Sequence, residues 1–371
     1  MRVNGLKLVN YRTYQELELA FQPALNIFIG CNAQGKTNIL EAVYYAACGS
    51  SFRGNSDGEL IKWNADGGSI SLGFSRLEVA NQLDFAFRRD KRRTIVYNGQ
   101  KIPLRELIGA FNVVLFAPDD LLLIKGAPAG RRKFLDMEIS QASPAYYREL
   151  ITYNRLLQQR NSLLKEIREG KSKAGMLEFW NPQLAASAAK ITAKRLEAVQ
   201  KFNMLANLMQ RRISGNEENL SLSYQIKGME NGQLAENMEI WYNEMLHGLN
   251  NEEIYRGVTC VGPHRDDIIV SVNGINLKSF GSQGQQRTAV LSMKLSELEF
   301  IRSETGEYPV LLLDDVMSEL DAGRRQQLLN FIEREGIQTL ITATDEAYFQ
   351  QAPLKTYFQV EAGQVKVVNK V

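Results

Sequence analysis

Hydrophobic and polar residues alternate near the start of the chain. Apolar side chains recur at about every second position in residues 6–11 and 17–21, and a continuous apolar run follows at 27–29. A period of two is typical of half-buried strands, and a short apolar run is typical of a strand buried on both faces. The pattern predicts two strands joined by a turn, leading into a buried strand.

The strand pattern returns in later segments. Residues 49–69 are rich in Gly, Ser, Asn and Asp and predict a surface loop. A hairpin-type turn is indicated at Asn98-Gly99. The segments that we interpret as strands are residues 69–77, 82–87, 93–97, 111–116, 220–226, 268–272, 309–313 and 337–343.

Helical periodicity dominates the middle of the chain. From about Ser140 to Met209 the composition shifts to Leu, Gln, Arg, Lys, Glu and Ala, and leucines recur every seven residues from Leu150. Asn161 and residues 170–175 divide this region into two expected helices. The helices could pair antiparallel as a short arm, or pack within an ordinary helical subdomain. A shorter helix is expected around residues 239–246.

A phosphate-binding loop follows the third expected strand. A Gly-x4-Gly-Lys-Thr sequence lies between this strand and a helix-period segment, the context that such a loop requires. Its glycines let the backbone amides surround the phosphates, its lysine reaches the same oxygens, and its threonine hydroxyl is a Mg²⁺ ligand. The expected ATP-binding residues here are Gly30, Cys31, Asn32, Ala33, Gln34, Gly35, Lys36 and Thr37. The alternative, an ordinary glycine-rich turn, does not explain the flanking strand and helix.

A Ser-x-Gly-Gln sequence precedes a long apolar helix in the C-terminal part. Ser282 is a plausible N-cap of this helix, which is one interpretation. The other is the signature motif of ABC-type ATPases, in which Ser282, Gly284 and Gln285 would bind the γ-phosphate held by a second subunit. We favour the signature because the chain already contains a phosphate-binding loop.

The strand at residues 309–313 ends in two carboxylates. A parallel strand beside the phosphate-binding loop would place Asp314 near Mg²⁺. Asp315 stands where ABC-type ATPases usually carry a glutamate that orients the attacking water, and its shorter side chain predicts slow hydrolysis. Residues 318–321 are expected to cross a dimer interface. Thr344-Asp345 replaces the histidine that transporter ATPases use to sense the γ-phosphate.

Composition limits the class of protein. Hydrophobic residues make up 44% and charged residues 23%, as in an ordinary globular protein, and no apolar run is long enough for a bilayer or a signal peptide. Three cysteines, Cys31, Cys48 and Cys260, show no metal-binding spacing, and their odd number fits reduced thiols in the cytoplasm. Two histidines exclude a histidine-rich metal site. The net charge of +2 means that any nucleic-acid surface must be a local patch.

Two cationic clusters are candidates for that patch. Residues 88–93 hold five cations at a hairpin tip, and residues 131–133 form a second cluster. Each could be a solvated surface or could bind the phosphate backbone of DNA. Arg12 could turn back toward the phosphates or stay in solvent. Arg265 could form an internal ion pair or contact phosphate, and His264 is more simply explained as structural.

The combination of motifs resembles the SMC-like branch of the ABC-type ATPases and, within it, the RecF family of bacterial recombination mediators. Thr37 and Ser282 are separated by a long insertion, as in that branch. The resemblance covers essentially the whole chain. It is carried by residues 10–12, 30–37, 116–120, 125–135, 262–267, 279–287 and 313–321.

The resemblance implies an α/β fold, an ABC-type ATPase head with an inserted, mostly helical second lobe. Residues 1–117 and 256–371 would form the head, and residues 118–255 the second lobe. It also implies ATP and Mg²⁺ as cofactors, with Lys36, Asp314 and Asp315 catalytic and with Thr37 and Asp314 holding the metal.

The expected function is that of an ATP-dependent DNA-binding protein with weak, DNA-stimulated ATPase activity. ATP would close two copies head to tail on duplex DNA beside single-stranded gaps. With RecO and RecR, the dimer would help to load RecA during replication and repair. The rivals are the ATPase subunit of a membrane transporter, another SMC-type head, and a structural DNA binder without ATP chemistry. The long insertion and the missing histidine speak against the first.

Overall fold

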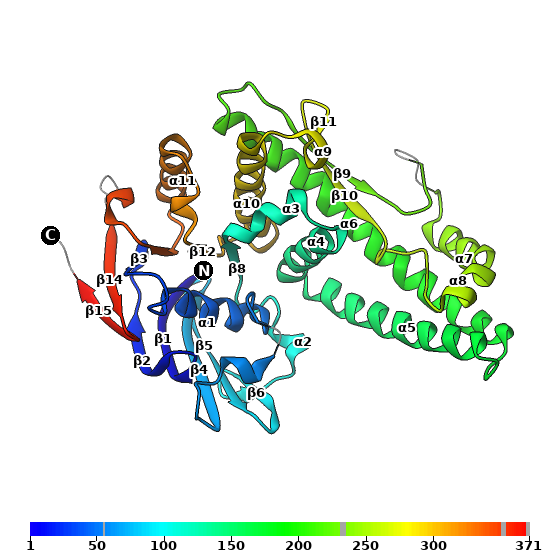
Figure 1. The fold of residues 1–371 in the computed structure, drawn as a ribbon, viewed down its shortest axis with the longest axis horizontal. Helices are drawn as coiled ribbons and strands as arrows, with labels where there is room; N and C mark the ends of the chain where they lie inside the picture. The colour runs from blue at the N-terminus through cyan, green and yellow to red at the C-terminus, as the bar shows by residue number, and fades with distance from the viewer. Residues whose placement is uncertain (55, 231–234, 350–353, 369–371) are drawn as a thin grey trace. The chain divides into compact units, whose positions relative to one another are not determined.

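The computed structural model describes residues 1–54, 56–230, 235–349 and 354–368, and Figure 1 shows the course of the chain. Contacts divide the chain into two compact units, Met1–Leu121 with Val290–Val371 and Leu122–Ala289. We call the first the head unit and the second the inserted unit. The sequence led us to expect boundaries near 117/118 and 255/256. Residues 256–289 group instead with the inserted unit, because β10 (Asp267–Val272) is hydrogen-bonded to β9 (Leu220–Gln225).

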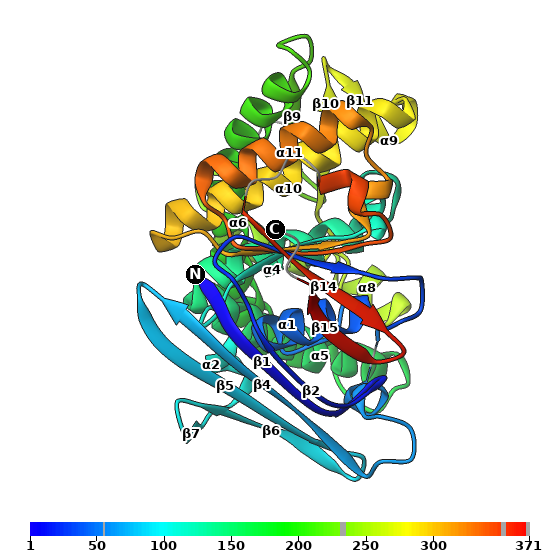
Figure 2. The ribbon, with the colours of Figure 1, turned by 90° about the vertical axis from the view of Figure 1, so that its left-hand side faces the viewer.

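The head unit contains a mostly parallel sheet of order β15-β14-β3-β13-β12-β8. Strands β3, β12 and β13 are buried along their whole length because α1 (Lys36–Cys48) lies on one face of the sheet and α11 (Ala322–Glu335) on the other (Figure 2). Only β15 runs antiparallel to its neighbour. The strands are β3 (Leu25–Ile29), β8 (Val113–Phe116), β12 (Val310–Asp314), β13 (Thr339–Ala343), β14 (Lys355–Glu361) and β15 (Gln364–Val368).

A second sheet of the head unit is antiparallel, of order β2-β1-β4-β5-β6-β7. It packs against α1, where the Tyr45 ring meets the rings of Phe85 and Phe87 at centroid distances of 5.5 and 5.2 Å. These strands confirm the alternation seen in the sequence. They are β1 (Arg2–Tyr11), β2 (Tyr14–Ala20), β4 (Gly67–Arg76), β5 (Val79–Arg88), β6 (Lys91–Tyr97) and β7 (Gln100–Lys101).

The inserted unit is mainly helical. Two long helices, α5 (Pro144–Arg168) and α6 (Leu177–Ile213), pack together, and a three-stranded sheet of order β11-β10-β9 completes the unit. The break between the helices lies at residues 169–176, as expected from its glycines. The expected break at Asn161 is wrong. Asn161 lies inside α5, where its side chain accepts hydrogen bonds from the backbone and the hydroxyl of Thr259.

The remaining elements are short, apart from α4 and α10. In the inserted unit they are α3 (Leu122–Lys125), α4 (Pro128–Ala142), η3 (Ala174–Met176), α7 (Met238–Gly248), α8 (Asn250–Arg256), β11 (Ile275–Asn276) and α9 (Leu277–Phe280). In the head unit they are η1 (Asp57–Leu60), α2 (Leu104–Leu107), η2 (Pro118–Leu121), η4 (Val316–Ser318) and η5 (Glu346–Phe349). Helix α10 (Gln283–Thr305) begins in the inserted unit and ends in the head unit. Among the described residues, no helix combines the length and the apolar character needed to cross a membrane.

Buried ion pairs hold the inserted unit together. Arg160 and Glu253 are both fully buried and lie 2.7 Å apart, and the Arg160 guanidinium also donates to Asn181 and Thr259. A buried guanidinium is tolerated only when its charge and its donors are satisfied. This pair therefore fixes α5 to α8 and to the loop that precedes β10.

Removing one partner of this pair should destabilise the unit strongly. Arg160→Ala leaves the Glu253 carboxylate buried without its cation, and we expect the free energy of unfolding to fall by about 3–5 kcal/mol. Urea unfolding followed by circular dichroism measures the change. The matched control carries Arg160→Met and Glu253→Leu together, which removes both charges and should recover much of the loss. A double variant as unstable as Arg160→Ala would contradict this account.

Candidate nucleotide-binding site

The phosphate-binding loop runs from the end of β3 to the start of α1 in the head unit. Its two glycines are required by their surroundings as well as by their backbone. A Cβ on Gly30 would lie 2.2 Å from the carbonyl oxygen of Val360 on β14. Gly35 has φ of +108°, and a Cβ there would lie 2.9 Å from the hydroxyls of Thr13 and Tyr14. The neighbouring strands therefore fix the loop from both sides.

The loop presents an anion site at the start of α1. Cys31, Asn32 and Ala33 are exposed, and no side chain caps the first turn of the helix, so its free amides and its positive dipole end are available to phosphate. Lys36 is buried, and its Nζ donates to the carbonyls of Gly30 and Cys31 at 2.6 and 3.0 Å. These bonds hold the ammonium across the loop.

A brace to the β14–β15 turn holds the rim of the loop. The backbone amide of Ala362 donates to the Gln34 side chain at 2.5 Å. Sequence reasoning missed this contact, because the two residues are far apart in the chain and the turn has no motif of its own. Gly363 could have suggested the turn itself, in which Ala362 and Gly363 both adopt positive φ.

A chain of hydrogen bonds joins the loop to the end of β12. The Thr37 hydroxyl and the Thr342 hydroxyl each donate to Asp314 Oδ1 at 2.8 Å. The sheet order brings the three residues together, because β13 lies between β3 and β12 and pairs in parallel with both. Burial raises the pKa of the Asp314 carboxyl, the two threonine bonds oppose the rise, and nearby Asp315 adds to it.

Asp315 adopts a left-handed backbone conformation. Its φ is +53°, its amide donates to the Thr342 hydroxyl at 2.9 Å, and its carbonyl accepts from the Ser318 hydroxyl at 2.8 Å. This conformation is uncommon for a residue other than glycine and is found where a structure must direct a side chain or turn sharply. It lets the chain leave β12 so that two adjacent carboxylates lie in different environments.

These residues fit ATP with Mg²⁺. Thr37 and Asp314 offer a hydroxyl and a carboxylate oxygen that already share one contact, and Mg²⁺ prefers such oxygen ligands. No group of three or more His, Cys, Asp or Glu side chains is placed to hold a metal anywhere in the described ranges. A Mg²⁺ ion would therefore take its remaining ligands from phosphate and water.

The signature candidates lie in the inserted unit, at the start of α10. Ser282 Oγ accepts from the amide of Gln285 at 3.2 Å, and the amide of Ser282 donates to the Gln285 side chain at 3.2 Å. This reciprocal pair is a capping box. Ser282 is thus the N-cap of α10 and remains exposed beside Gly284, and its role as a signature residue stays a prediction.

Several of the candidate cations have other partners. Arg12 pairs with buried Glu41 at 2.6 Å and donates to the backbone carbonyl of Glu59, so its guanidinium has partners within the head unit. Arg131 is buried against Asp267 at 2.7 Å, which corrects its proposed role in DNA binding. The Arg265 guanidinium donates to the carbonyl of Thr259. His264 Nε2 lies 3.1 Å from the same carbonyl and donates to it in the tautomer that carries the proton on Nε2. Burial lowers the pKa of His264 to about 4, so this histidine is structural and neutral.

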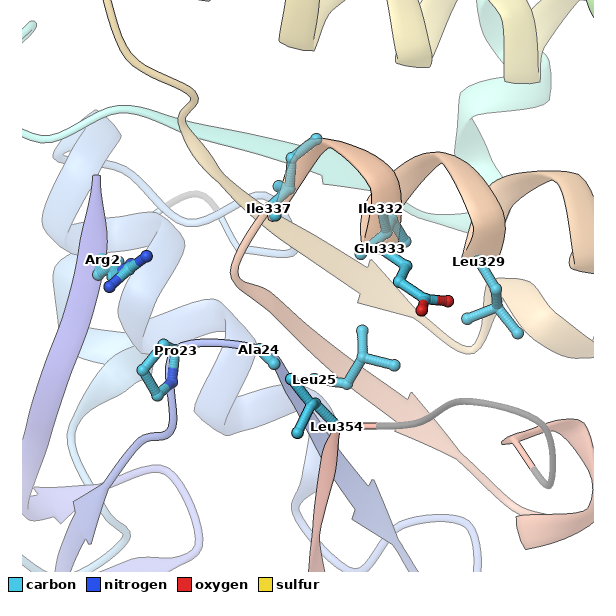
Figure 3. A pocket seen from close by; sticks show the side chains of 10 residues that line it. Arg2, Pro23, Ala24, Leu25, Leu329, Ile332, Glu333, Ile337 and Leu354 are labelled. Carbon is cyan, nitrogen blue, oxygen red and sulfur yellow. The ribbon is translucent and has the colours of Figure 1, made fainter.

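A cavity of about 240 Å³ lies at the N-terminal end of β3 in the parallel sheet (Figure 3). Leu25, at the start of β3, lines it together with Leu329 and Ile332 of α11, and Arg2 and Glu333 stand at its sides. The phosphate-binding loop follows the other end of β3. This mainly apolar cavity is therefore separate from the nucleotide site.

Comparison with known proteins shows the family of this chain. The family model for the RecF/RecN/SMC N-terminal domain matches residues 2–368. A DNA replication and repair protein RecF from Halothermothrix orenii is 44% identical over 349 residues, 93% of this chain and 92% of the relative. RecF from Listeria monocytogenes is 41% identical over 372 residues, 99% of this chain and 100% of the relative. The chain belongs to the RecF family.

Solved structures give the same result. A structure of the recombination mediator protein RecF-ATP in the RecFOR pathway has a TM-score of 0.92 and 34% identity, covering 99% of this chain and 98% of that one. An Smc head bound to the C-terminal winged-helix domain of ScpA has a TM-score of 0.56 and 15% identity, covering 99% and 97%, and shares the fold. The ABC-type head expected from the sequence is therefore confirmed.

Asp314→Asn should have opposite effects on the free and the ligand-bound protein. Because the folded carboxyl has a raised pKa, its ionised form destabilises the fold at pH 7, and the amide removes that cost. We expect the melting temperature without Mg²⁺ to rise by about 2 °C at pH 7. The difference should shrink as the pH falls through the raised pKa of the folded carboxyl, because the folded wild-type protein then takes up the proton.

Addition of Mg²⁺ and ATP should reverse the order, because only the wild type keeps the anionic ligand. Calorimetry at the two pH values, with and without Mg-ATP, measures both effects. Glu16→Gln, at an exposed carboxylate on β2, is the matched control and should change neither. An Asp314→Asn protein stabilised by Mg-ATP as much as the wild type would contradict the assignment.

Proposed function

We propose that this chain is an ATP-dependent DNA-binding recombination mediator with weak, DNA-stimulated ATPase activity. The observation that carries the proposal is the Thr37–Asp314 hydrogen bond beside a phosphate-binding loop whose lysine is held in place. Membership of the RecF family supports it, since curated relatives are DNA replication and repair proteins. A solved relative is a RecF-ATP structure in the RecFOR pathway.

The residues of the head unit would divide the work on ATP between them. The amides of residues 30–35 and Lys36 would bind the β- and γ-phosphates, and Thr37 with Asp314 would hold Mg²⁺. Bound Mg²⁺ neutralises phosphate charge and fixes the geometry of the phosphates. Asp315 would orient the attacking water. Its carboxylate is one methylene shorter than the usual glutamate, which fits slow turnover.

A second copy would complete each site. Ser282, Gly284 and Gln285 lie exposed or partly exposed at the N-terminus of α10, where the positive end of the helix dipole favours an anion. In the proposed head-to-tail dimer they would bind the γ-phosphate held by the partner. ATP would then set the dimer population, because the closed form gains contacts that the monomer lacks.

DNA would be the substrate of the closed dimer. Four exposed cations remain at the β5–β6 hairpin tip, Arg88, Arg89, Lys91 and Arg92, and they offer a local positive surface on a chain of low net charge. We propose that the dimer holds duplex DNA beside single-stranded gaps. RecR and RecO would be the direct protein partners, and RecA would be loaded as a result.

Ser282→Arg tests the composite site. The larger, positively charged arginine side chain should leave ATP binding to the monomer within about twofold of wild type and should abolish ATP-induced dimers. Sedimentation velocity with Mg²⁺ and a non-hydrolysable ATP analogue measures the monomer–dimer ratio. Ser221→Arg, on the exposed side of β9, is the control and should dimerise normally. An unchanged dimer fraction in Ser282→Arg would refute the proposed role of the signature.

Asp315→Asn tests the hydrolytic step. The amide cannot accept a proton from the attacking water, and we expect turnover to fall by about 10²-fold while ATP-induced dimerisation persists. Retention on DNA should lengthen accordingly. Steady-state phosphate release and DNA dissociation rates are the two measurements, with Glu16→Gln on β2 as a control. Normal turnover in Asp315→Asn would exclude this carboxylate from the water-orienting role.

A further inference from the structure

Trp63 is the most exposed large hydrophobic residue in the described part of the chain. Its side chain is 88% exposed, at a turn between the bridge residue Ile61 and β4 of the head unit. An indole ring buries a large area when it finds a partner, so a fully presented tryptophan is costly to leave in water. Its exposure indicates a contact with a molecule outside the chain.

Three hydrogen bonds join the Trp63 turn to the β5–β6 hairpin tip. The amide of Arg89 donates to the carbonyl of Asp66 at 3.3 Å, and its guanidinium donates to the carbonyls of Ala65 and Lys62 at 3.0 and 3.4 Å. Arg89 thus binds the backbone on both sides of Trp63. The ring and the cationic tip form one surface, which we call the tryptophan–arginine surface.

The charge of this surface is positive. Arg88, Arg89, Lys91 and Arg92 are exposed, and Lys62 adds a partly buried ammonium that donates to the carbonyl of Thr13. The opposing carboxylates are Asp66 and Asp90, both exposed. Arg93 does not contribute, because it pairs with Asp57 at 2.9 Å. Cations therefore outnumber anions on the tryptophan–arginine surface.

We propose that Trp63 stacks on an unpaired nucleobase while the cations of the tryptophan–arginine surface bind the phosphates beside it. Aromatic rings next to basic side chains are the combination that holds single-stranded nucleic acid, since every base has a face that can stack. Bases inside a duplex are already stacked on both sides. Trp63 would therefore recognise the single-stranded side of a gap, which rests on the proposed DNA-binding function and adds a residue that reads strandedness.

A protein partner is the competing occupant, because Trp and Arg are also frequent at the centres of protein interfaces. The local charge favours the nucleic acid. The cations lie on the hairpin tip that Arg89 joins to the Trp63 turn, and the residues adjacent to Trp63 in that turn are Lys62 and Asn64. Interface centres usually combine an aromatic anchor with other apolar side chains and few charges.

Trp63→Ala separates base stacking from phosphate binding. Fluorescence anisotropy with Mg²⁺ and a non-hydrolysable ATP analogue should compare a blunt duplex with a gapped duplex of the same length. Loss of one stacked base should weaken binding to the gapped duplex by about five- to thirtyfold. Binding to the blunt duplex should change by less than about twofold. The salt dependence on both substrates should be unchanged, since no charge is removed.

Two further variants make the result specific. Trp63→Phe keeps a stacking ring and should recover most of the affinity for the gapped duplex. Lys91→Gln with Arg92→Gln keeps the ring but removes two charges, and should weaken binding to both substrates with a shallower salt dependence. Because Trp63 is exposed, the melting temperature of each Trp63 variant should match the wild type.

The outcomes separate the two proposals. Wild-type protein that binds neither substrate would defeat the proposed DNA-binding function itself. Normal DNA binding by the wild type together with equal binding by Trp63→Ala would overturn only the stacking role. An equal loss on blunt and gapped duplex would also overturn it. Full DNA binding by Trp63→Ala with lost binding of purified RecR or RecO would assign the ring to a protein partner instead.

Discussion

The hydrogen bonds from Thr37 and Thr342 to Asp314 are the contact on which the nucleotide site depends. They exist because β13 lies between the loop-bearing strand β3 and the carboxylate-bearing strand β12, with Asp314 in register with Thr342. A slip of one residue in this parallel pairing would turn Asp314 to the other face of the sheet. The register is protected by the apolar side chains of β12 and β13, which are buried on both faces of the sheet. Packing of the core therefore sets the position of the Asp314 carboxylate.

Two residues at the end of β12 lower the stability of the fold. Asp314 is held as a buried carboxylate with a raised pKa, and Asp315 follows it in a left-handed conformation. Both features oppose folding. Both lie at the candidate ligand site, where interactions with a charged ligand would offset their cost. The glycines of the phosphate loop are constrained by neighbouring strands as well as by phosphate, so the loop is shaped before any ligand is considered.

Sequence patterns predicted most of the secondary structure and the phosphate loop. The strands, the two long helices, the phosphate loop and the approach of Asp314 to Thr37 follow from periodicity, from a specific motif and from parallel pairing. Three features did not follow. Asn161 looked like a helix break, yet tertiary bonds to Thr259 keep it inside α5. Arg131 was expected to be a surface cation, yet its side chain is buried and pairs with Asp267, far along the chain. The brace from Ala362 to Gln34 also joins distant residues. Contacts between distant segments leave no periodic trace in a sequence.

Completion of each site by a second copy is the central claim, and a mixing experiment tests it most directly. Lys36→Ala and Ser282→Arg each damage both sites of a homodimer. If the signature acts across the dimer, a mixture of the two variants forms heterodimers with one undamaged site, and ATP-induced dimerisation and part of the ATPase activity return on mixing. If each chain used its own Ser282, every site in the mixture would stay damaged. Recovered dimers and turnover support the account, and a mixture as inactive as its components would contradict it.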